Sequence, residues 1–320
     1  MEVTETFPKR QWGKRPNPPG VPLPAPAPAP APADLAPPPW AARLVAGAAQ
    51  PLVARADSFT VTVRDAGRFT LVTARVAGAS ALDDPSFERC TAEAYRALAD
   101  VVRARPPRHP LRFWNHIPAI RRCDEPGLDR YMVFNAGRYA ACSDWFGSPD
   151  AFDRLLPTAS AVGHDGHDLV VHALAGEEGG VAVENPRQVP SYRYSRRFGP
   201  RPPCFARGTS VRWHESGGAT ILVGGTASIR GEDSVHRGDL RAQAHETFEN
   251  LGALVRSAGA PGLGSFESLR VYYVHAADRD AITRTVAEAF PHLRDVEYVT
   301  ADLCRPELLV EIEGVACAGL

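Results

Sequence analysis

Hydrophobic and polar positions alternate regularly from Phe59 onward, and the alternation predicts two successive α+β units. Residues 59–65 and 68–76 alternate as paired strands do, with a turn at Ala66–Gly67. Residues 86–105 have the spacing of an amphipathic helix. Its apolar stripe consists of Cys90, Ala94, Leu98, Val101 and Val102.

The first half continues with a strand at residues 111–117, an apolar segment at 131–142, a helical turn near 150–156 and a strand at 167–176. Its predicted order is therefore strand-strand-helix-strand-helix-strand.

The second half repeats this order. Residues 207–213 and 219–228 predict strands, and residues 239–259 predict a helix with Asp239 near its N-cap and Gly259 just beyond its end. The buried stripe of this helix is expected to be Leu240, Ala244, Thr247, Phe248, Leu251 and Val255. A strand at 267–275, a helix at 279–290 ended by Pro291, and closing strands at 296–303 and 307–314 follow. The repeated order suggests an internal structural duplication.

The chain opens with a low-complexity segment that contains PAPAPAPAPA. Such a sequence favours extended polyproline conformations and does not form a core. We therefore expect four parts: a disordered tail over residues 1–40, an N-terminal domain over 41–175, a connecting segment over 176–206 and a C-terminal catalytic domain over 207–320. The connecting segment is long, polar and rich in proline, as functional loops often are.

The composition of the chain argues against a nucleic-acid-binding protein and against a membrane protein. The 320 residues are 44% hydrophobic and 23% charged, with a net charge of −1, so no overall field attracts nucleic acid or an anionic membrane. No apolar run approaches the length of a transmembrane helix, and the N-terminus lacks the apolar core of a signal peptide. The six cysteines are scattered without a CxxC motif, as in cytosolic proteins with free thiols. We expect a cytoplasmic protein without a cofactor.

Residues 224–243 form a glycine-rich turn between a strand and a helix, a place where backbone N–H groups attract anions. Neither GxxxxGK[ST] nor GxGxxG is present, so a nucleotide loop is not supported, and a plain tight turn explains the glycines equally well. His164, His167 and His172 do not have the spacing of a known zinc motif, so no metal site is expected.

Two Tyr/Arg pairs are candidate carboxylate binders. Tyr131 and Arg138 lie seven residues apart, and Tyr194 and Arg207 lie thirteen apart in the connecting segment. An Arg fork binds a carboxylate bidentately, and a Tyr hydroxyl adds a neutral donor. Two such pairs would suit a dicarboxylate, although solvated surface pairs would have the same spacing.

Glu311 and Glu313 share one side of the apolar strand at 307–314. Desolvation would raise the pKa of a buried carboxyl group there and suit it to general-acid catalysis. A charge that protects an exposed edge strand is the alternative.

The segments 224–259 and LLVEIEG resemble the RidA/YjgF-like fold. Together with ENPRQVPSYRY, PPCFARGTS and the additional N-terminal half, they resemble the chorismatase family from Phe59 to the C-terminus. The resemblance implies an α+β fold of two RidA/YjgF-like (chorismate mutase-like) halves, each a mixed sheet with helices packed on one side.

The resemblance also implies a reaction. Chorismatases remove the enolpyruvyl group of chorismate as pyruvate and leave either 3-hydroxybenzoate or, by hydrolysis, a dihydroxycyclohexadiene carboxylate. Glu311 corresponds to the family's catalytic acid, which protonates the enol ether. Tyr131, Arg138, Tyr194 and Arg207 correspond to substrate binders, and Ser228 is expected to line the pocket. Cys304 stands where the aromatic-forming branch has cysteine, which favours 3-hydroxybenzoate.

Two other functions stay open at this stage. A RidA-like imine deaminase would need an arginine shortly after the FP motif, but Arg294 lies at a different distance from Glu311. A ligand-binding module that kept the fold is the other alternative. Because both halves lie in one chain, we expect a monomer.

Overall fold

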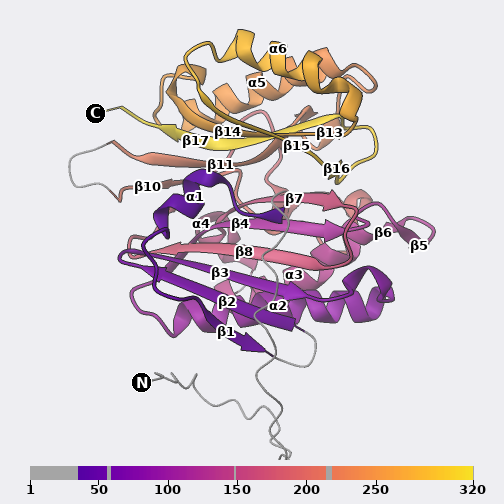
Figure 1. Ribbon diagram of the computed structural model, residues 1–320. Coiled ribbons are helices and arrows are strands. Elements are labelled where there is room, and N and C mark those ends of the chain that lie inside the picture. The colour runs from indigo at the N-terminus through magenta and orange to yellow at the C-terminus, as the bar shows by residue number, and fades with distance from the viewer. Residues whose placement is uncertain (1–34, 56–58, 148, 214–217, 320) are drawn as a thin grey trace, which may run out of the picture.

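Two β-sheets stacked on one another form the centre of the molecule, and helices cover their outer sides (Figure 1). The computed structural model describes residues 35–55, 59–147, 149–213 and 218–319. Helices α2 (Asp84–Arg103) and α3 (Arg130–Phe146) lie on one sheet, and α5 (Leu240–Ser257) and α6 (Arg279–Ala289) on the other. The expected α+β fold of two sheet-and-helix halves is confirmed.

Among the described residues, the N-terminal sheet contains seven strands. In spatial order they are β1 (Leu52–Arg55), β2 (Phe59–Ala66), β3 (Phe69–Val76), β8 (Leu169–Gly176), β4 (His109–Pro118), β7 (Thr158–His164) and β16 (Asp302–Leu303). Strand β16 comes from the C-terminal part of the chain and pairs with β7, so the two halves share a sheet.

The C-terminal sheet contains six strands in the part of the chain that the structure describes. In spatial order they are β15 (Asp295–Thr300), β14 (Phe266–Tyr273), β17 (Val310–Cys317), β11 (Thr220–Ala227), β10 (Gly208–Val211) and β9 (Val181–Val183). Strand β17 pairs with β14 on one side and β11 on the other. Glu311 therefore lies on an interior strand, and the interpretation of this residue as a protective charge on an edge strand is wrong.

Shorter elements complete the fold. They are the helices α1 (Pro39–Leu44) and α4 (Phe152–Leu155) and the hairpins β5–β6 (Cys123–Glu125, Leu128–Asp129) and β12–β13 (Ile229–Arg230, Asp233–Ser234). The β12–β13 hairpin lies within the glycine-rich segment that follows β11, so the chain does not pass directly from strand to helix there.

The helices follow the predicted patterns. All five residues expected in the stripe of α2 are buried. Asp239 caps α5 by accepting a hydrogen bond from the backbone N–H of Ala242 at 2.9 Å, and Gly259 has a φ of +88°, a left-handed conformation that glycine adopts without strain. The stripe of α5 is buried except Leu240, which is half-buried.

An apolar cluster joins the facing sides of the two sheets. Its buried members are Leu111 from the N-terminal sheet and Val211, Trp213, Leu222 and Val315 from the C-terminal half. Because these side chains are withdrawn from water only while the sheets stay together, they stabilise the association of the halves.

Residues 35–40 pack against both halves, so the expectation that they belong to a disordered tail is wrong. Leu35 is buried, and its carbonyl oxygen accepts a hydrogen bond from His172 at 2.8 Å. The next carbonyl, of Ala36, accepts one from Arg270 at 2.8 Å. The rest of the predicted tail, residues 1–34, lies outside the described residues.

Within the described ranges, no helix is both long enough and apolar enough to cross a membrane.

Candidate active site

A cavity of about 220 Å³ opens between the two halves. Its walls come from α3, β7, the connecting segment, β11 and β17 and from the residues just after β16. Six of the seven residues nominated from the sequence line it: Tyr131, Arg138, Tyr194, Arg207, Cys304 and Glu311. The same cavity also includes Ser160, Phe198, Phe205, Gly225, Ile229 and Arg305.

Glu311 points from β17 toward a break in the neighbouring strand. The register between β11 and β17 shifts between Val223 and Thr226, which is the signature of a β-bulge. Gly225 lies in this bulge, and a Cβ atom there would overlap Oε1 of Glu311. Glycine at position 225 therefore leaves the space that the carboxyl group occupies.

The surroundings of Glu311 favour its protonated form. Burial raises the pKa of Glu311 to about 8, and the negative charge of Glu313 adds to the rise. The positive charges of Arg112 and Arg207 act in the opposite direction and lower the pKa of Glu311. A carboxylic acid with such a pKa holds its proton at neutral pH and can donate it.

Glu313 is itself kept in place by an interaction between the two sheets. Its carboxylate accepts hydrogen bonds from Arg112 at 2.6 Å and from the indole nitrogen of Trp114 at 2.9 Å, and the hydroxyl of Ser160 donates to it as well. Arg112 and Glu313 are both almost fully buried. The pair fixes a negative charge two residues from Glu311 on the same side of β17.

Tyr131 and Arg138 lie two helical turns apart on α3, and both line the cavity. The Arg138 side chain is buried, and its Nε and Nη2 atoms have no hydrogen-bond partner among the described residues. Because an unpartnered buried guanidinium group is costly, these N–H groups are available to an anion in the cavity. Burial raises the pKa of the Tyr131 hydroxyl, which stays a neutral donor.

Arg207 and Tyr194 are in direct contact. Nη2 of Arg207 donates to the Tyr194 hydroxyl oxygen at 2.6 Å, which leaves the Tyr194 proton free to be donated elsewhere. Nε of Arg207 is buried without a partner. The backbone carbonyl of Arg207 accepts hydrogen bonds from Gly224 at 2.9 Å and from Thr158 at 3.1 Å, which fix the start of β10 against the N-terminal sheet.

Phe205 lies beside both arginines. The guanidinium carbons of Arg138 and Arg207 are 5.5 Å and 5.2 Å from the centroid of its ring, within the range of cation–π interactions.

Cys304, which directly follows β16, is half-buried, and burial raises the pKa of its thiol to about 12. The thiol is therefore neutral at physiological pH.

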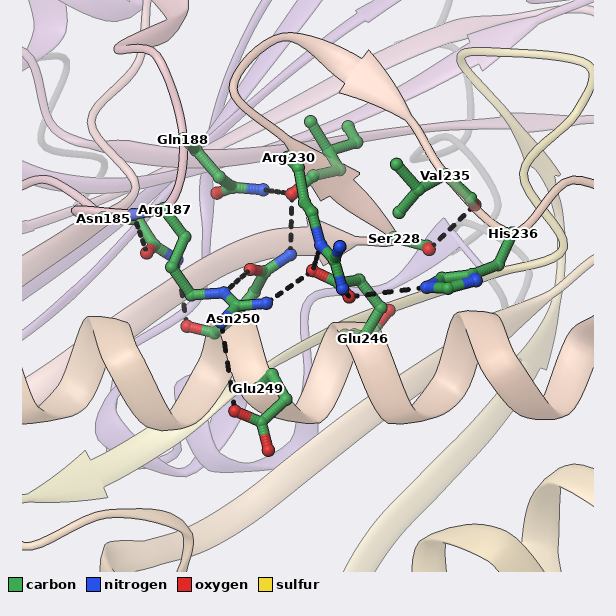
Figure 2. A network of polar contacts seen from close by, with 12 residues as sticks. Asn185, Arg187, Gln188, Ser228, Arg230, Val235, His236, Glu246, Glu249 and Asn250 are labelled. Atoms are coloured by element: carbon green, nitrogen blue, oxygen red, sulfur yellow. Dashed lines mark hydrogen bonds and ion pairs between the residues drawn. The ribbon is translucent and has the colours of Figure 1, made fainter.

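Ser228 does not line the cavity, contrary to the sequence-based expectation. Its side chain is fully buried, and its hydroxyl donates to the carbonyl oxygen of Val235 at 3.0 Å within the hairpin segment (Figure 2). The bulge in β11 shifts the alternation of the strand, so the residues on either side of Ser228, and not Ser228 itself, face the cavity. Gly225, Ala227 and Ile229 form the wall instead.

Sequence reasoning missed several residues of the site. Arg305 follows Cys304 directly, and a charge next to a nominated residue was the available signal. Arg112 and Glu313 meet across 201 residues of sequence, and no local pattern predicts such a pair. The described residues contain no cluster of three metal-ligating side chains.

Comparisons with known proteins show the family of this chain. A family model described as "Chorismatase FkbO/Hyg5-like, N-terminal" matches residues 48–175. A protein named chorismatase from Streptomyces rapamycinicus is 32% identical over 237 residues, which cover 70% of this chain and 69% of that protein. The chain belongs to the chorismatase family.

Two further matches agree with this assignment. A protein named 3-hydroxybenzoate synthase from Streptomyces hygroscopicus is 38% identical over 217 residues, which cover 64% of this chain and 62% of that protein's length. A crystal structure of a chorismatase at 1.08 Å resolution superimposes with a TM-score of 0.71 at 25% identity. That match covers 84% of this chain and 80% of the other.

Proposed function

We propose that this protein converts chorismate to pyruvate and 3-hydroxybenzoate, with Glu311 as the general acid. The observation that carries the proposal is the placement of a protonated carboxylic acid in a cavity that also contains two buried, incompletely bonded arginines. Membership of the chorismatase family and the similarity to a protein named 3-hydroxybenzoate synthase support the choice of substrate and product.

Substrate binding would use the two Tyr/Arg pairs. Chorismate carries one carboxylate on its ring and one on the enolpyruvyl side chain. The free N–H groups of Arg138 and Arg207 would hold these anions, and the hydroxyl protons of Tyr131 and Tyr194 would add neutral donors. Fixing both ends positions the enol ether beside Glu311 and removes part of the entropic barrier.

The chemical step is a proton transfer to carbon. Glu311 would donate its proton to the terminal methylene of the enol ether, and the adjacent carbon becomes an oxocarbenium ion. Water adds to this carbon and gives up a proton to the carboxylate. The resulting hemiketal breaks the bond between that carbon and the ether oxygen, the hemiketal proton passes to the ether oxygen, which stays on the ring as a hydroxyl group, and pyruvate is released. A general acid of this kind contributes typically about 10²–10⁴-fold to the rate.

Cys304 is the reason for proposing 3-hydroxybenzoate, and not the dihydroxycyclohexadiene carboxylate, as the ring product. Aromatisation removes the C4 hydroxyl of the ring as water, so the water taken up in pyruvate release is balanced by the water lost. A neutral thiol beside Tyr131 offers a weakly polar surface against which the ring loses this hydroxyl. Hydrolysis without aromatisation would leave the dihydroxycyclohexadiene carboxylate.

The test is product analysis with purified protein and chorismate. Pyruvate is followed with lactate dehydrogenase and NADH, and the ring product is separated by chromatography against standards of both ring products. We expect equal amounts of pyruvate and 3-hydroxybenzoate, and loss of both with Glu311→Gln. A diene diol as the sole ring product would refute the branch, and no pyruvate from the wild type would refute the function.

The geometry does not favour imine hydrolysis. Arg294, the arginine closest to the position that a RidA-like deaminase would need, is exposed and donates to the carbonyl oxygen of Pro291 at 3.2 Å. It does not line the cavity.

A further inference from the structure

One part of the cavity wall, residues 190–199 of the connecting segment, lies outside both sheets. Its lining residues are Tyr194, Arg197 and Phe198. Among the described residues, the backbone groups of this lining stretch form backbone hydrogen bonds only with one another. Its start is anchored by Ser191, whose hydroxyl donates to the carbonyl oxygen of Phe205 at 2.6 Å. The position of the rest therefore depends on contacts made by side chains.

Glu232, in the turn of the β12–β13 hairpin, makes a contact of this kind. Its carboxylate accepts hydrogen bonds from the backbone N–H of Ser195 at 2.9 Å, from the hydroxyl of Ser195 at 2.8 Å and from Nη2 of Arg197 at 3.2 Å. The bond from the backbone N–H of Ser195 does most to hold the pKa of Glu232 below its usual range. Because the acceptor is ionised, these hydrogen bonds are stronger than those between neutral groups.

The β12–β13 hairpin is itself fixed to α5. Nε and Nη2 of Arg230 donate to the two carboxylate oxygens of Glu246 at 2.9 Å and 2.6 Å (Figure 2). The side chain of Glu246 is only 3% exposed. Nδ2 of Asn250 donates to the carbonyl oxygen of Ile229 at 2.9 Å. The hairpin therefore gives the lining stretch a fixed support.

Tyr194 is the residue just before the contact with Glu232, and its hydroxyl accepts a hydrogen bond from Nη2 of Arg207 at 2.6 Å. Arg305 provides a second support. Its Nη1 donates to the backbone carbonyl oxygen of Glu232 at 2.8 Å, and its guanidinium carbon lies 4.1 Å from the ring centroid of Phe198. Movement of the lining stretch away from the hairpin would separate the Tyr194 hydroxyl from Arg207.

We propose that Glu232 is a positioning residue that holds residues 194–198 in the cavity wall and so keeps Tyr194 against Arg207. Glu232 does not line the cavity, so it acts through the lining stretch and not on a ligand. Its effect on chorismate rests on the proposed function. The holding of the lining stretch does not, because it is measured on the protein without a ligand.

The first test measures hydrogen–deuterium exchange of the backbone in the ligand-free protein. Glu232→Ala removes the acceptor, and we expect exchange in residues 193–199 to become at least about 10-fold faster. Ser195→Ala keeps the backbone N–H bond and should give a smaller increase. Asp233→Asn is the matched control, because Asp233 is 65% exposed and pairs with Arg197 at 2.6 Å. Its exchange should stay within about 2-fold of the wild type.

The second test separates positioning from a general loss of stability. Tyr194 and Arg207 are assigned to binding, which is needed equally in the bound substrate and in the transition state. Glu232→Ala should therefore raise KM for chorismate about 10-fold and leave kcat within about 3-fold, whereas Asp233→Asn should change neither.

Unchanged exchange in Glu232→Ala, or faster exchange with an unchanged KM, would overturn the proposal. If exchange of the lining stretch depends on Glu232 but the wild type releases no pyruvate from chorismate, the proposed function fails and the holding of the stretch by Glu232 stands.

Discussion

At the scale of single residues, the site depends on the protonation state of Glu311. The carboxyl group is placed where burial and the neighbouring charge of Glu313 both disfavour ionisation. Such an arrangement costs stability in order to retain a proton at neutral pH. The two carboxylates of β17 therefore have different roles: Glu313 stays paired with Arg112, and Glu311 stays neutral and faces the cavity.

Glu311→Gln should stabilise the fold at high pH. The folded-state pKa of about 8 lies above the ordinary carboxyl pKa of 4.5, so the folded state binds more protons than the unfolded state between these values. Stability of the wild type therefore falls as the pH rises from about 4.5 to about 8. We expect Tm of the variant to exceed that of the wild type by several degrees at pH 8 and by much less at pH 5. Equal Tm differences at both pH values would contradict a raised pKa.

Much of the site could be predicted at this scale, and the failures have physical reasons. Tyr131, Arg138, Tyr194, Arg207, Cys304 and Glu311 all line one cavity, as residue type and family resemblance suggested. Their roles in binding and catalysis stay predictions. The expectation from the family resemblance that Ser228 lines the pocket is wrong, because downstream of the bulge in β11 the neighbouring Ala227 and Ile229 face the cavity and Ser228 bonds within the hairpin segment. The Arg112–Glu313 pair could not be predicted from the sequence, because only the stacking of the two sheets brings these residues together.

At the scale of elements, the bulge in β11 connects the strand pattern to the site. Two glycines occupy it, and they face different surroundings. A Cβ atom at Gly225 would overlap the end of the Glu311 side chain, which can rotate away. A Cβ atom at Gly224 would lie 2.8 Å from the backbone carbonyl oxygen of Ala159 and 3.0 Å from that of Arg207, neither of which can move alone.

The two alanine variants should therefore separate activity from stability. Gly225→Ala should reduce kcat at least about 10-fold, because a displaced acid loses its alignment with the substrate, and should change Tm little. Gly224→Ala should lower Tm by several degrees, because backbone overlap at the junction forces the sheets apart. Pyruvate release and thermal unfolding measured on both variants check this. A Gly225→Ala enzyme with full activity would be inconsistent with the position assigned to Glu311.

Most long elements were predictable from the sequence, but several shorter elements and one long strand were not. Strand β7 (Thr158–His164) was not predicted, because its residues are mostly small and all but the last are buried, so no polar alternation marks it. It runs parallel to β4 and pairs with β16, and it supplies Ser160 to the cavity. A strand that joins the two halves thus lacks the alternation of polar and apolar residues from which other strands were predicted.

At the scale of the whole molecule, the halves are joined by several independent contacts. The apolar cluster around Leu111 and Leu222, the pairing of β7 with β16, and the buried Arg112–Glu313 pair all cross between them. Residues 35–45 add a further connection, because Leu35 and Ala36 bind one half each and Trp40 packs on Trp114 with ring centroids 5.6 Å apart.

These contacts predict one cooperative unfolding transition for both halves. Differential scanning calorimetry of the wild type should show a single peak whose calorimetric and van't Hoff enthalpies agree. Trp40→Ala should lower the unfolding free energy by about 2–3 kcal/mol, as truncation of a half-buried aromatic side chain does, while keeping one peak. Two resolved transitions in the wild type would show that the halves unfold independently.

The dependence of pyruvate release on pH tests the central claim most directly. If Glu311 donates its proton from within the cavity, kcat/KM for chorismate should be constant at low pH and fall tenfold per pH unit above about 8. Glu313→Gln removes the neighbouring negative charge and should move this fall to lower pH by about one unit. A rate that instead rises with pH through a pKa near that of an ordinary carboxyl group would contradict the account, because Glu311 would then act in its ionised form.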